Sequence, residues 1–125
     1  MILDTNALSA FADGDEGLRD RVAGARRLAL PTVVLGEFRY GIARSRHRAA
    51  YTRWLAELSN AVEVLDVTDR TASVYADLRV ALERAGRPIP ANDAWIAALG
   101  LQHGLPVLTR DRHFDAVPGL DRSSW

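Results

Sequence analysis

Short apolar runs alternate along the chain with longer segments in which apolar residues recur at helical spacing. The runs at residues 2–3, 28–30, 62–65 and 107–108 predict four short strands. Helical spacing predicts one helix after the first strand and further helices over 32–41, 51–58, 68–85 and 90–103, the last two stopped by Gly86 and Gly104. The tail, residues 121–125, predicts either a final edge strand or a segment that docks Trp125.

The order of these elements predicts an α/β fold. Strands that are separated by helices pair in parallel through right-handed crossovers, so helices are expected on both faces of the sheet. A chain of 125 residues fits one domain, and no linker or internal repeat divides it. We therefore expect residues 1–125 to form a single domain.

Composition excludes several kinds of chemistry. The sequence has no cysteine, which excludes disulfides, thiolate nucleophiles and cysteine-ligated zinc. All 16 basic residues are arginine, so a P-loop ATPase or a lysine-based catalyst is excluded as well. No apolar stretch is long enough to span a membrane, and the N-terminus lacks a signal-type segment. We expect a cytoplasmic protein.

Three aspartates occupy positions that topology should bring together. Asp4 follows the first strand, Asp111 follows the fourth, and Asp93 stands at a helix N-terminus. Ligands of open parallel sheets bind beyond the carboxyl ends of the strands, so these acids are expected at one edge. Each also has an ordinary structural interpretation, since Asp is common at helix caps and in turns.

Glu37 lies within a predicted helix among apolar neighbours, including Val34 and Tyr40. A buried carboxylate needs a partner, which is either an arginine such as Arg39 or a metal ion shared with other acids. Three or four clustered carboxylates favour a hard divalent cation, Mg²⁺ or Mn²⁺. Such a cation would relieve the repulsion between the acids and activate a water molecule.

An arginine-rich stretch accompanies these acids in a chain whose net charge is zero. No acidic residue falls between Phe38 and Ala56. An acidic pocket beside a basic strip suits a phosphodiester substrate, because arginines hold the phosphates while the acids hold the metal. The alternative is a solvated pair of helices. The candidate phosphate-binding residues are Arg39, Arg44, Arg46 and Arg48.

Four segments, taken in order, match a known family. They are residues 1–6 (MILDTN), 34–41 (VLGEFRYG), 89–98 (IPANDAWIAA) and 107–120 (VLTRDRHF, then VPGL after two residues). With these segments the sequence closely resembles PIN-domain ribonucleases of the VapC toxin type over essentially the whole chain. The resemblance implies a three-layer α/β/α sandwich around a mostly parallel sheet of four to five strands.

The resemblance also implies a function. Members of that family are Mg²⁺- or Mn²⁺-dependent endoribonucleases that cut tRNA or rRNA, commonly dimerise, and are inhibited by a cognate antitoxin that covers the acidic site. The family's acidic quartet corresponds to Asp4, Glu37, Asp93 and Asp111. We expect Asp4, Asp93 and Asp111 to hold metal and Glu37 to orient or deprotonate the attacking water. Hydrolysis by a metal-activated water should leave 5′-phosphate and 3′-hydroxyl ends.

Supporting residues are also expected. Asn6 and Thr109 would position the carboxylates. Asp115 stands four residues after Asp111 and is an alternative fourth acid. His113 lies in the same loop and is a weaker candidate for contact with substrate.

Two other functions compete with this interpretation. A haloacid-dehalogenase-type phosphohydrolase also places an Asp after its first strand, but it needs a second acid two residues later, where this chain has Asn6, and normally a lysine. A non-catalytic PIN-like module that binds RNA or a protein would be expected to have lost acids of the quartet.

Overall fold

The computed structural model describes all 125 residues, Met1–Trp125, as an α/β fold with a five-stranded parallel sheet. The expected fold class is therefore confirmed. The strands are β1 (Ile2–Leu3), β2 (Ala29–Pro31), β3 (Glu63–Leu65), β4 (Val107–Leu108) and β5 (Arg122–Ser123). The helices are α1 (Thr5–Ala12), α2 (Glu16–Ala23), α3 (Thr32–Ile42), α4 (Arg48–Ala61), α5 (Asp69–Arg84), α6 (Ala91–His103) and the 3₁₀ helix η1 (Arg112–Ala116).

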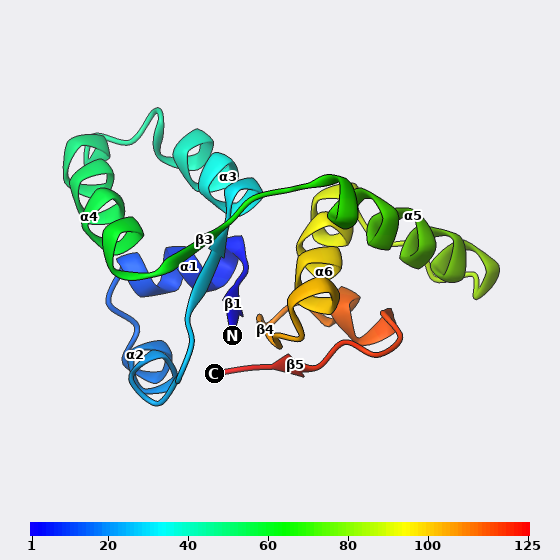
Figure 1. Cartoon of the computed structure of the whole chain (residues 1–125). Coiled ribbons are helices and arrows are strands. Elements are labelled where there is room, and N and C mark those ends of the chain that lie inside the picture. The colour runs from blue at the N-terminus through cyan, green and yellow to red at the C-terminus, as the bar shows by residue number, and fades with distance from the viewer.

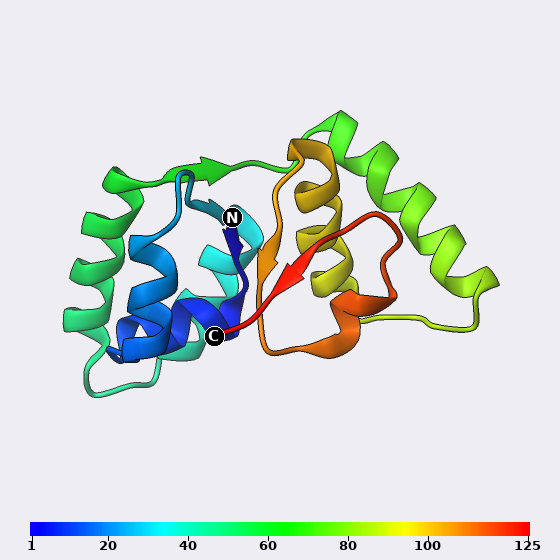
Figure 2. The ribbon, with the colours of Figure 1, turned by 90° about the horizontal axis from the view of Figure 1, so that it is seen from below.

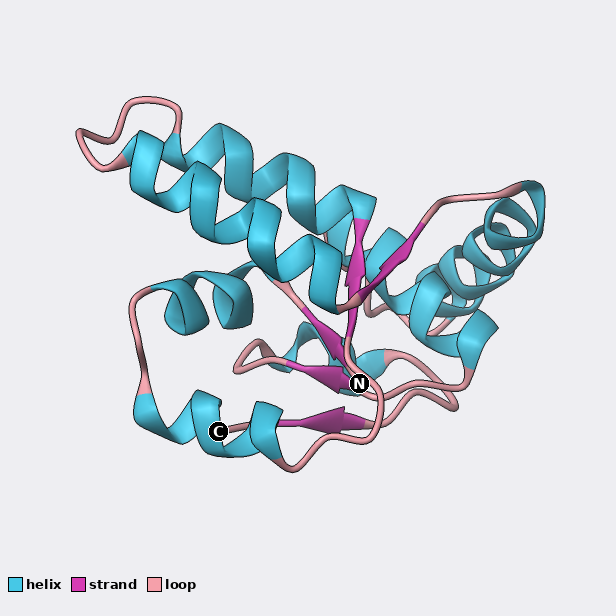
Figure 3. Ribbon diagram, turned by 60° about the vertical axis from the view of Figure 1, so that its left-hand side comes forward, coloured by secondary structure: helices cyan, strands magenta, loops and turns pink.

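The strand order β3-β2-β1-β4-β5 determines where the helices lie. The chain moves from β1 outward to β2 and β3, then returns past β1 to β4. Because parallel crossovers are right-handed, this reversal places α1 to α4 on one face and α5, α6 and η1 on the other. Figures 1 and 2 show these two groups of helices on opposite sides of the sheet, and Figure 3 shows the strands enclosed between helices.

The segment between β1 and β2 differs from the expectation of one helix, since it holds both α1 and α2. The helix α1 ends before Asp13 and Gly14. Gly14 has a φ of 82°, which other residues rarely adopt. Asp15 then caps α2 by accepting a hydrogen bond from the Leu18 N–H at 2.9 Å. These three residues carry the signal for the break, because Asp and Gly favour turns and caps.

The helix α3 begins at Thr32, but Thr32 does not cap it. Pro31 is the N-cap of α3, and Thr32 is the first helical residue. The Thr32 hydroxyl donates instead to the Leu65 carbonyl, which ties the start of α3 to β3. Thr68, by contrast, caps α5, within a capping box that it shares with Thr71.

The core lies between the sheet and its two helical layers. The strand residues Ile2, Leu3, Leu30, Val107 and Leu108 are fully buried. The tail forms β5, and Trp125 packs partly buried against the core, with the Arg110 guanidinium 4.2 Å from the centre of its ring. None of the helices combines the length and the hydropathy needed to cross a membrane.

Candidate active site

The carboxyl ends of β1 and β4 meet where the strand order reverses. Connections leave the sheet in opposite directions on either side of this point, and open α/β sheets commonly bind their ligands in a crevice at such a place. Leu3 is in register with Leu108, so the next residues, Asp4 and Thr109, lie side by side at this point. The topology thus brings together residues that the sequence separates by more than 100 positions.

Asp4 is held rigidly at this edge. It is 4 % exposed and caps α1, its Oδ1 accepting a hydrogen bond from the Ala7 N–H at 2.8 Å. Its Oδ2 accepts a hydrogen bond from the Thr109 hydroxyl. Burial raises the pKa of Asp4, the two hydrogen bonds oppose that rise, and the neighbouring Asp93 and Asp111 carboxylates add to it. Asp4 therefore serves both as a helix cap and as a member of an acidic group.

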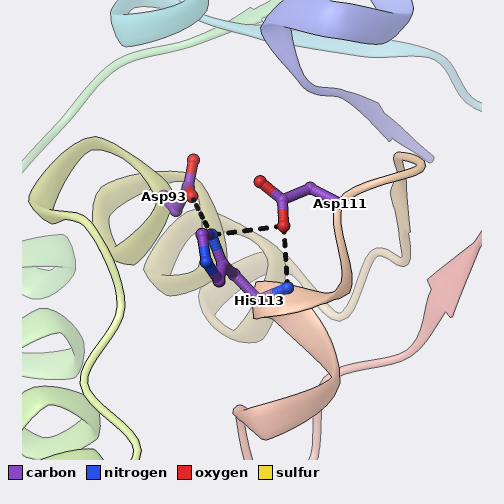
Figure 4. A group of neighbouring side chains, drawn as sticks. All are labelled: Asp93, Asp111 and His113. Carbon is purple, nitrogen blue, oxygen red and sulfur yellow. Dashed lines mark hydrogen bonds and ion pairs between the residues drawn. The ribbon is translucent and has the colours of Figure 1, made fainter.

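Asp93, Asp111 and His113 form a close cluster at the same edge (Figure 4). The His113 Nδ1 lies 3.3 Å from Asp93 Oδ2 and 3.2 Å from Asp111 Oδ1. One ligand atom from each of the three residues falls within 4.8 Å of the other two. The cluster thus has the donor types and the spacing to hold a divalent cation.

Asp93 comes from the first turn of α6, but it does not cap the helix. Pro90 is the N-cap, and no side chain caps this end. The Asp93 carboxylate is consequently free to face the cluster from a helix N-terminus, where negative charge is favoured. Burial raises its pKa, the hydrogen bond with His113 opposes the rise, and the Asp111 carboxylate adds to it.

Thr109 links Asp4 to the loop that carries Asp111. Its hydroxyl oxygen accepts a hydrogen bond from the Asp111 N–H at 2.9 Å while its hydrogen is donated to Asp4. Asp111 caps η1, and its Oδ1 accepts a hydrogen bond from the His113 N–H at 2.8 Å. The loop after β4 is therefore fixed relative to β1 by buried polar contacts.

Glu37 lies half-buried on α3, and its Oε1 is buried without a hydrogen-bond partner. It forms no ion pair with Arg39, so the expected arginine alternative is not what the structure shows. The helix face around Glu37 is also less buried than its apolar residues predict, because Tyr40 is 85 % exposed. Glu37 instead lines a cavity of about 280 Å³ between α1, α3 and α4, together with Thr5, whose Oγ1 is likewise buried and unpartnered.

Two of the expected supporting residues form no hydrogen bond or ion pair with these acids. Asn6 is exposed in the first turn of α1. The loop after Asp111 does form the helical turn that would align Asp115 with it, but Asp115 pairs with Arg122 of β5 at 2.5 Å. That ion pair lowers the pKa of Asp115. The geometry therefore places Asp111, and not Asp115, beside Asp93.

The four candidate RNA-binding arginines lie together along the chain on α3, α4 and the loop that joins these helices. None of them forms an ion pair with an acidic residue, and all are exposed. Ser45 from the same loop lines the cavity that Glu37 faces. The loop of the basic stretch thus borders the same cavity as Glu37. The four arginines of this basic stretch are Arg39, Arg44, Arg46 and Arg48.

His113 lies closer to the acids than its place in the sequence indicates. Its position two residues after Asp111 was the available signal, but only the 3₁₀ turn shows that its ring lies against two carboxylates. The other two histidines, His47 and His103, have no contact of this kind with the cluster.

Comparisons with known proteins agree with this arrangement. The model of the PIN domain family matches residues 1–120. Ribonuclease VapC5 of Mycobacterium tuberculosis is 34% identical over 120 residues, which cover 94% of this chain and 87% of that protein. Ribonuclease VapC4 of the same organism is 33% identical over 104 residues, 82% of this chain and 79% of that protein.

Solved structures show the same fold. VapBC from Salmonella typhimurium, solved bound to DNA, matches with a TM-score of 0.88 and 28% identity over 99% of this chain and 96% of that one. VapBC-5 from Mycobacterium tuberculosis, described as a toxin–antitoxin system, matches with a TM-score of 0.75 and 33% identity over 98% and 97% of the two chains. The family model and these full-length similarities show that the chain belongs to the PIN-domain family, as an endoribonuclease of the VapC toxin type.

Proposed function

We propose that this chain is the toxin of a toxin–antitoxin pair, a Mg²⁺-dependent endoribonuclease that hydrolyses tRNA or rRNA and leaves 5′-phosphate and 3′-hydroxyl ends. The observation that carries the proposal is the meeting of Asp4, Asp93 and Asp111 at the strand-order reversal. In this proposal residues 1–125 act as one nuclease domain in the cytoplasm, and Mn²⁺ can replace Mg²⁺.

The side chains present fit a divalent cation. Burial raises the pKa of both Asp4 and Asp93, and the Asp111 carboxylate raises each further, so ionising Asp4 and Asp93 is unfavourable unless positive charge compensates it. Oxygen atoms dominate the donor set, as Mg²⁺ and Mn²⁺ prefer. The buried and unpartnered Glu37 Oε1 is a further polar atom that lacks a partner within the chain.

The four acids then divide between two roles. Asp4, Asp93 and Asp111 hold the cation, and the Thr109 hydroxyl keeps Asp4 fixed relative to the Asp111 loop. Glu37 orients the attacking water and accepts its proton, for which an oxygen without another hydrogen-bond donor is suited. A bound cation supplies charge neutralisation at the phosphate and lowers the pKa of water.

The arginines on α3, α4 and their connecting loop contact the RNA backbone. Because they are exposed and unpaired, their charge is available to phosphates. Contacts of this type position an RNA without reading its sequence. The choice of RNA therefore depends on the shape of the crevice and of the neighbouring cavity.

An antitoxin and a second copy of the chain are the proposed protein partners. Similar structures include VapBC complexes and a toxin–antitoxin complex from Klebsiella pneumoniae, which supports a cognate antitoxin here. A relative at 27% identity, from Shigella flexneri, is named a tRNA(fMet)-specific endonuclease, which supports tRNA as one substrate class.

The proposal is tested by incubating purified, antitoxin-free protein with total tRNA and rRNA in Mg²⁺, Mn²⁺ or chelator, and by mapping the new ends. Asp93→Asn is the preferred inactive variant, since Asp93 caps no helix, whereas Asp4→Ala would also remove the α1 cap. Asp77→Asn, an exposed position on α5, is the matched control. Discrete metal-dependent cuts that Asp93→Asn abolishes and Asp77→Asn retains support the nuclease. Folded wild-type protein that binds RNA without cutting any of it would instead indicate a non-catalytic RNA-binding module.

A further inference from the structure

The imidazole of His113 lies between two carboxylates of the acidic site (Figure 4). Its Nδ1 is 3.3 Å from Asp93 Oδ2 and 3.2 Å from Asp111 Oδ1. Its own backbone N–H is bonded to Asp111 Oδ1 at 2.8 Å, so the base of the side chain is anchored to one of the acids. The ring is held at the cluster by both its backbone and its side-chain nitrogen.

These spacings match those between neighbouring ligands of one cation. Two ligands at right angles on an octahedral ion, each about 2.1 Å from it, are separated by about 3 Å. The distances from Nδ1 to both carboxylate oxygens are close to that value. The three ligand atoms span no more than 4.8 Å, so a small closing movement of the exposed His113 and the half-buried Asp111 side chains suffices for a shared ion.

We propose that His113 Nδ1 is a ligand of the divalent cation, beside the carboxylates of Asp93 and Asp111, and that it shifts the site's preference toward Mn²⁺ over Mg²⁺. This inference rests on the proposed metal-dependent function. A ligating Nδ1 offers its lone pair, so the ring hydrogen lies on Nε2. His113 is 52% exposed at its side chain, which leaves water available to that hydrogen.

The preference for Mn²⁺ follows from the donor type. Mg²⁺ strongly favours oxygen ligands and retains its waters, whereas first-row transition ions gain affinity from imidazole nitrogen in the Irving–Williams order. Removing the imidazole should therefore weaken Mn²⁺ binding more than Mg²⁺ binding. We expect His113→Ala to lower Mn²⁺ affinity by at least about 10- to 100-fold, the loss already caused by removing a group that only supports a metal ligand.

A hydrogen-bonding role is the competing explanation. In that case the Nδ1–H group would only hold Asp93 and Asp111 in place, without touching the ion. His113→Asn separates the two, because its side-chain amide retains an N–H donor but offers no imidazole nitrogen. Rescue of the preference for Mn²⁺ over Mg²⁺ by His113→Asn would favour hydrogen bonding and contradict ligation, because an amide oxygen that bound the ion would not confer this preference.

The other histidines provide internal controls. His47 precedes α4 and lines a cavity with Trp54, while His103 ends α6 beside Gly104. Neither belongs to the acidic cluster. His47→Ala and His103→Ala should leave any histidine signal at the metal unchanged.

The deciding experiment is pulsed electron paramagnetic resonance of Mn²⁺ bound to the full chain, in which bound ¹⁴N gives electron spin-echo modulation. Wild-type protein, His47→Ala and His103→Ala should show nitrogen coupling that changes when histidine is labelled with ¹⁵N. His113→Ala should lose it. Suppose that wild-type protein binds Mn²⁺ stoichiometrically, that Asp93→Asn loses this binding, and that the wild-type signal shows no histidine coupling. This result overturns the ligand assignment while the proposed metal site stands. Failure of wild-type protein to bind Mn²⁺ or Mg²⁺ would overturn the proposed function itself, and with it this inference.

Discussion

The Thr109 hydroxyl donates a hydrogen bond to the Asp4 carboxylate across 105 positions of sequence. The same oxygen accepts the Asp111 N–H at 2.9 Å, so one buried hydroxyl connects the ends of β1 and β4. This contact sits where the strand order reverses, and it fixes the spacing between the first and last acids of the site.

Thr109→Val tests that connection. Valine keeps the shape of threonine but removes both hydrogen bonds, which leaves a buried Asp4 oxygen unsatisfied. We expect the free energy of unfolding to fall by about 1–3 kcal/mol and RNA cleavage to fall by about 10- to 100-fold. Chemical denaturation and single-turnover cleavage measure the two effects. Thr109→Ser, which restores the hydroxyl, should recover most of both, and failure to do so would remove the hydroxyl from the explanation.

Asp93→Asn should abolish RNA cleavage and stabilise the folded protein in the absence of metal. Burial raises the pKa of Asp93, so folding favours its uncharged form, and the ionised carboxylate costs stability at neutral pH. In chelator at pH 7 the variant should therefore melt at a higher temperature than the wild type. The difference should shrink as pH falls toward the ordinary Asp value of 3.8, where the wild-type carboxyl takes up its proton. A variant that is equally stable at every pH would contradict this origin of the raised pKa.

Asp15 gives the opposite pH dependence. The Leu18 N–H hydrogen bond lowers its pKa, so the ionised cap stabilises the folded state above the ordinary Asp value, and that contribution is lost as pH falls through the folded-state pKa. Asp15→Ala should lower the melting temperature at pH 7 and by less near pH 3. Thermal melts over this range provide the measurement. A constant difference between the two proteins would show that the carboxylate charge has no part in the effect.

The arginines of α3, α4 and their loop should contribute salt-dependent RNA affinity. For single-stranded RNA, each phosphate contact adds about 0.7 to the slope of log K against log salt. Arg44→Ala and Arg46→Ala should each reduce that slope, while Arg70→Ala, exposed on α5, should not. Binding titrations with catalytically inactive Asp93→Asn protein avoid cleavage. If neither loop variant changes the slope, the RNA binds at a different surface of the protein.

Much of the site could be predicted because it depends on topology. Asp4 and Asp111 follow strands, and the carboxyl ends of parallel strands share one edge. Local geometry could not be predicted in the same way. The position of the His113 ring depends on a five-residue 3₁₀ turn, and the break between α1 and α2 on the conformation of Gly14. The exposure of Tyr40 depends on how α3 rotates against its neighbours, which helical spacing alone does not specify.

The central claim is that these acids direct a water molecule onto an RNA phosphate. The most direct measurement uses whichever RNA the assay on total tRNA and rRNA shows to be cut. That RNA is cleaved in H₂¹⁸O with Mg²⁺, and the new ends are examined by mass spectrometry. The account predicts one ¹⁸O atom in each new 5′-phosphate and an unlabelled 3′-hydroxyl. A 2′,3′-cyclic phosphate or a 3′-phosphate at the cut would contradict it, because the 2′-hydroxyl and not water would then be the nucleophile.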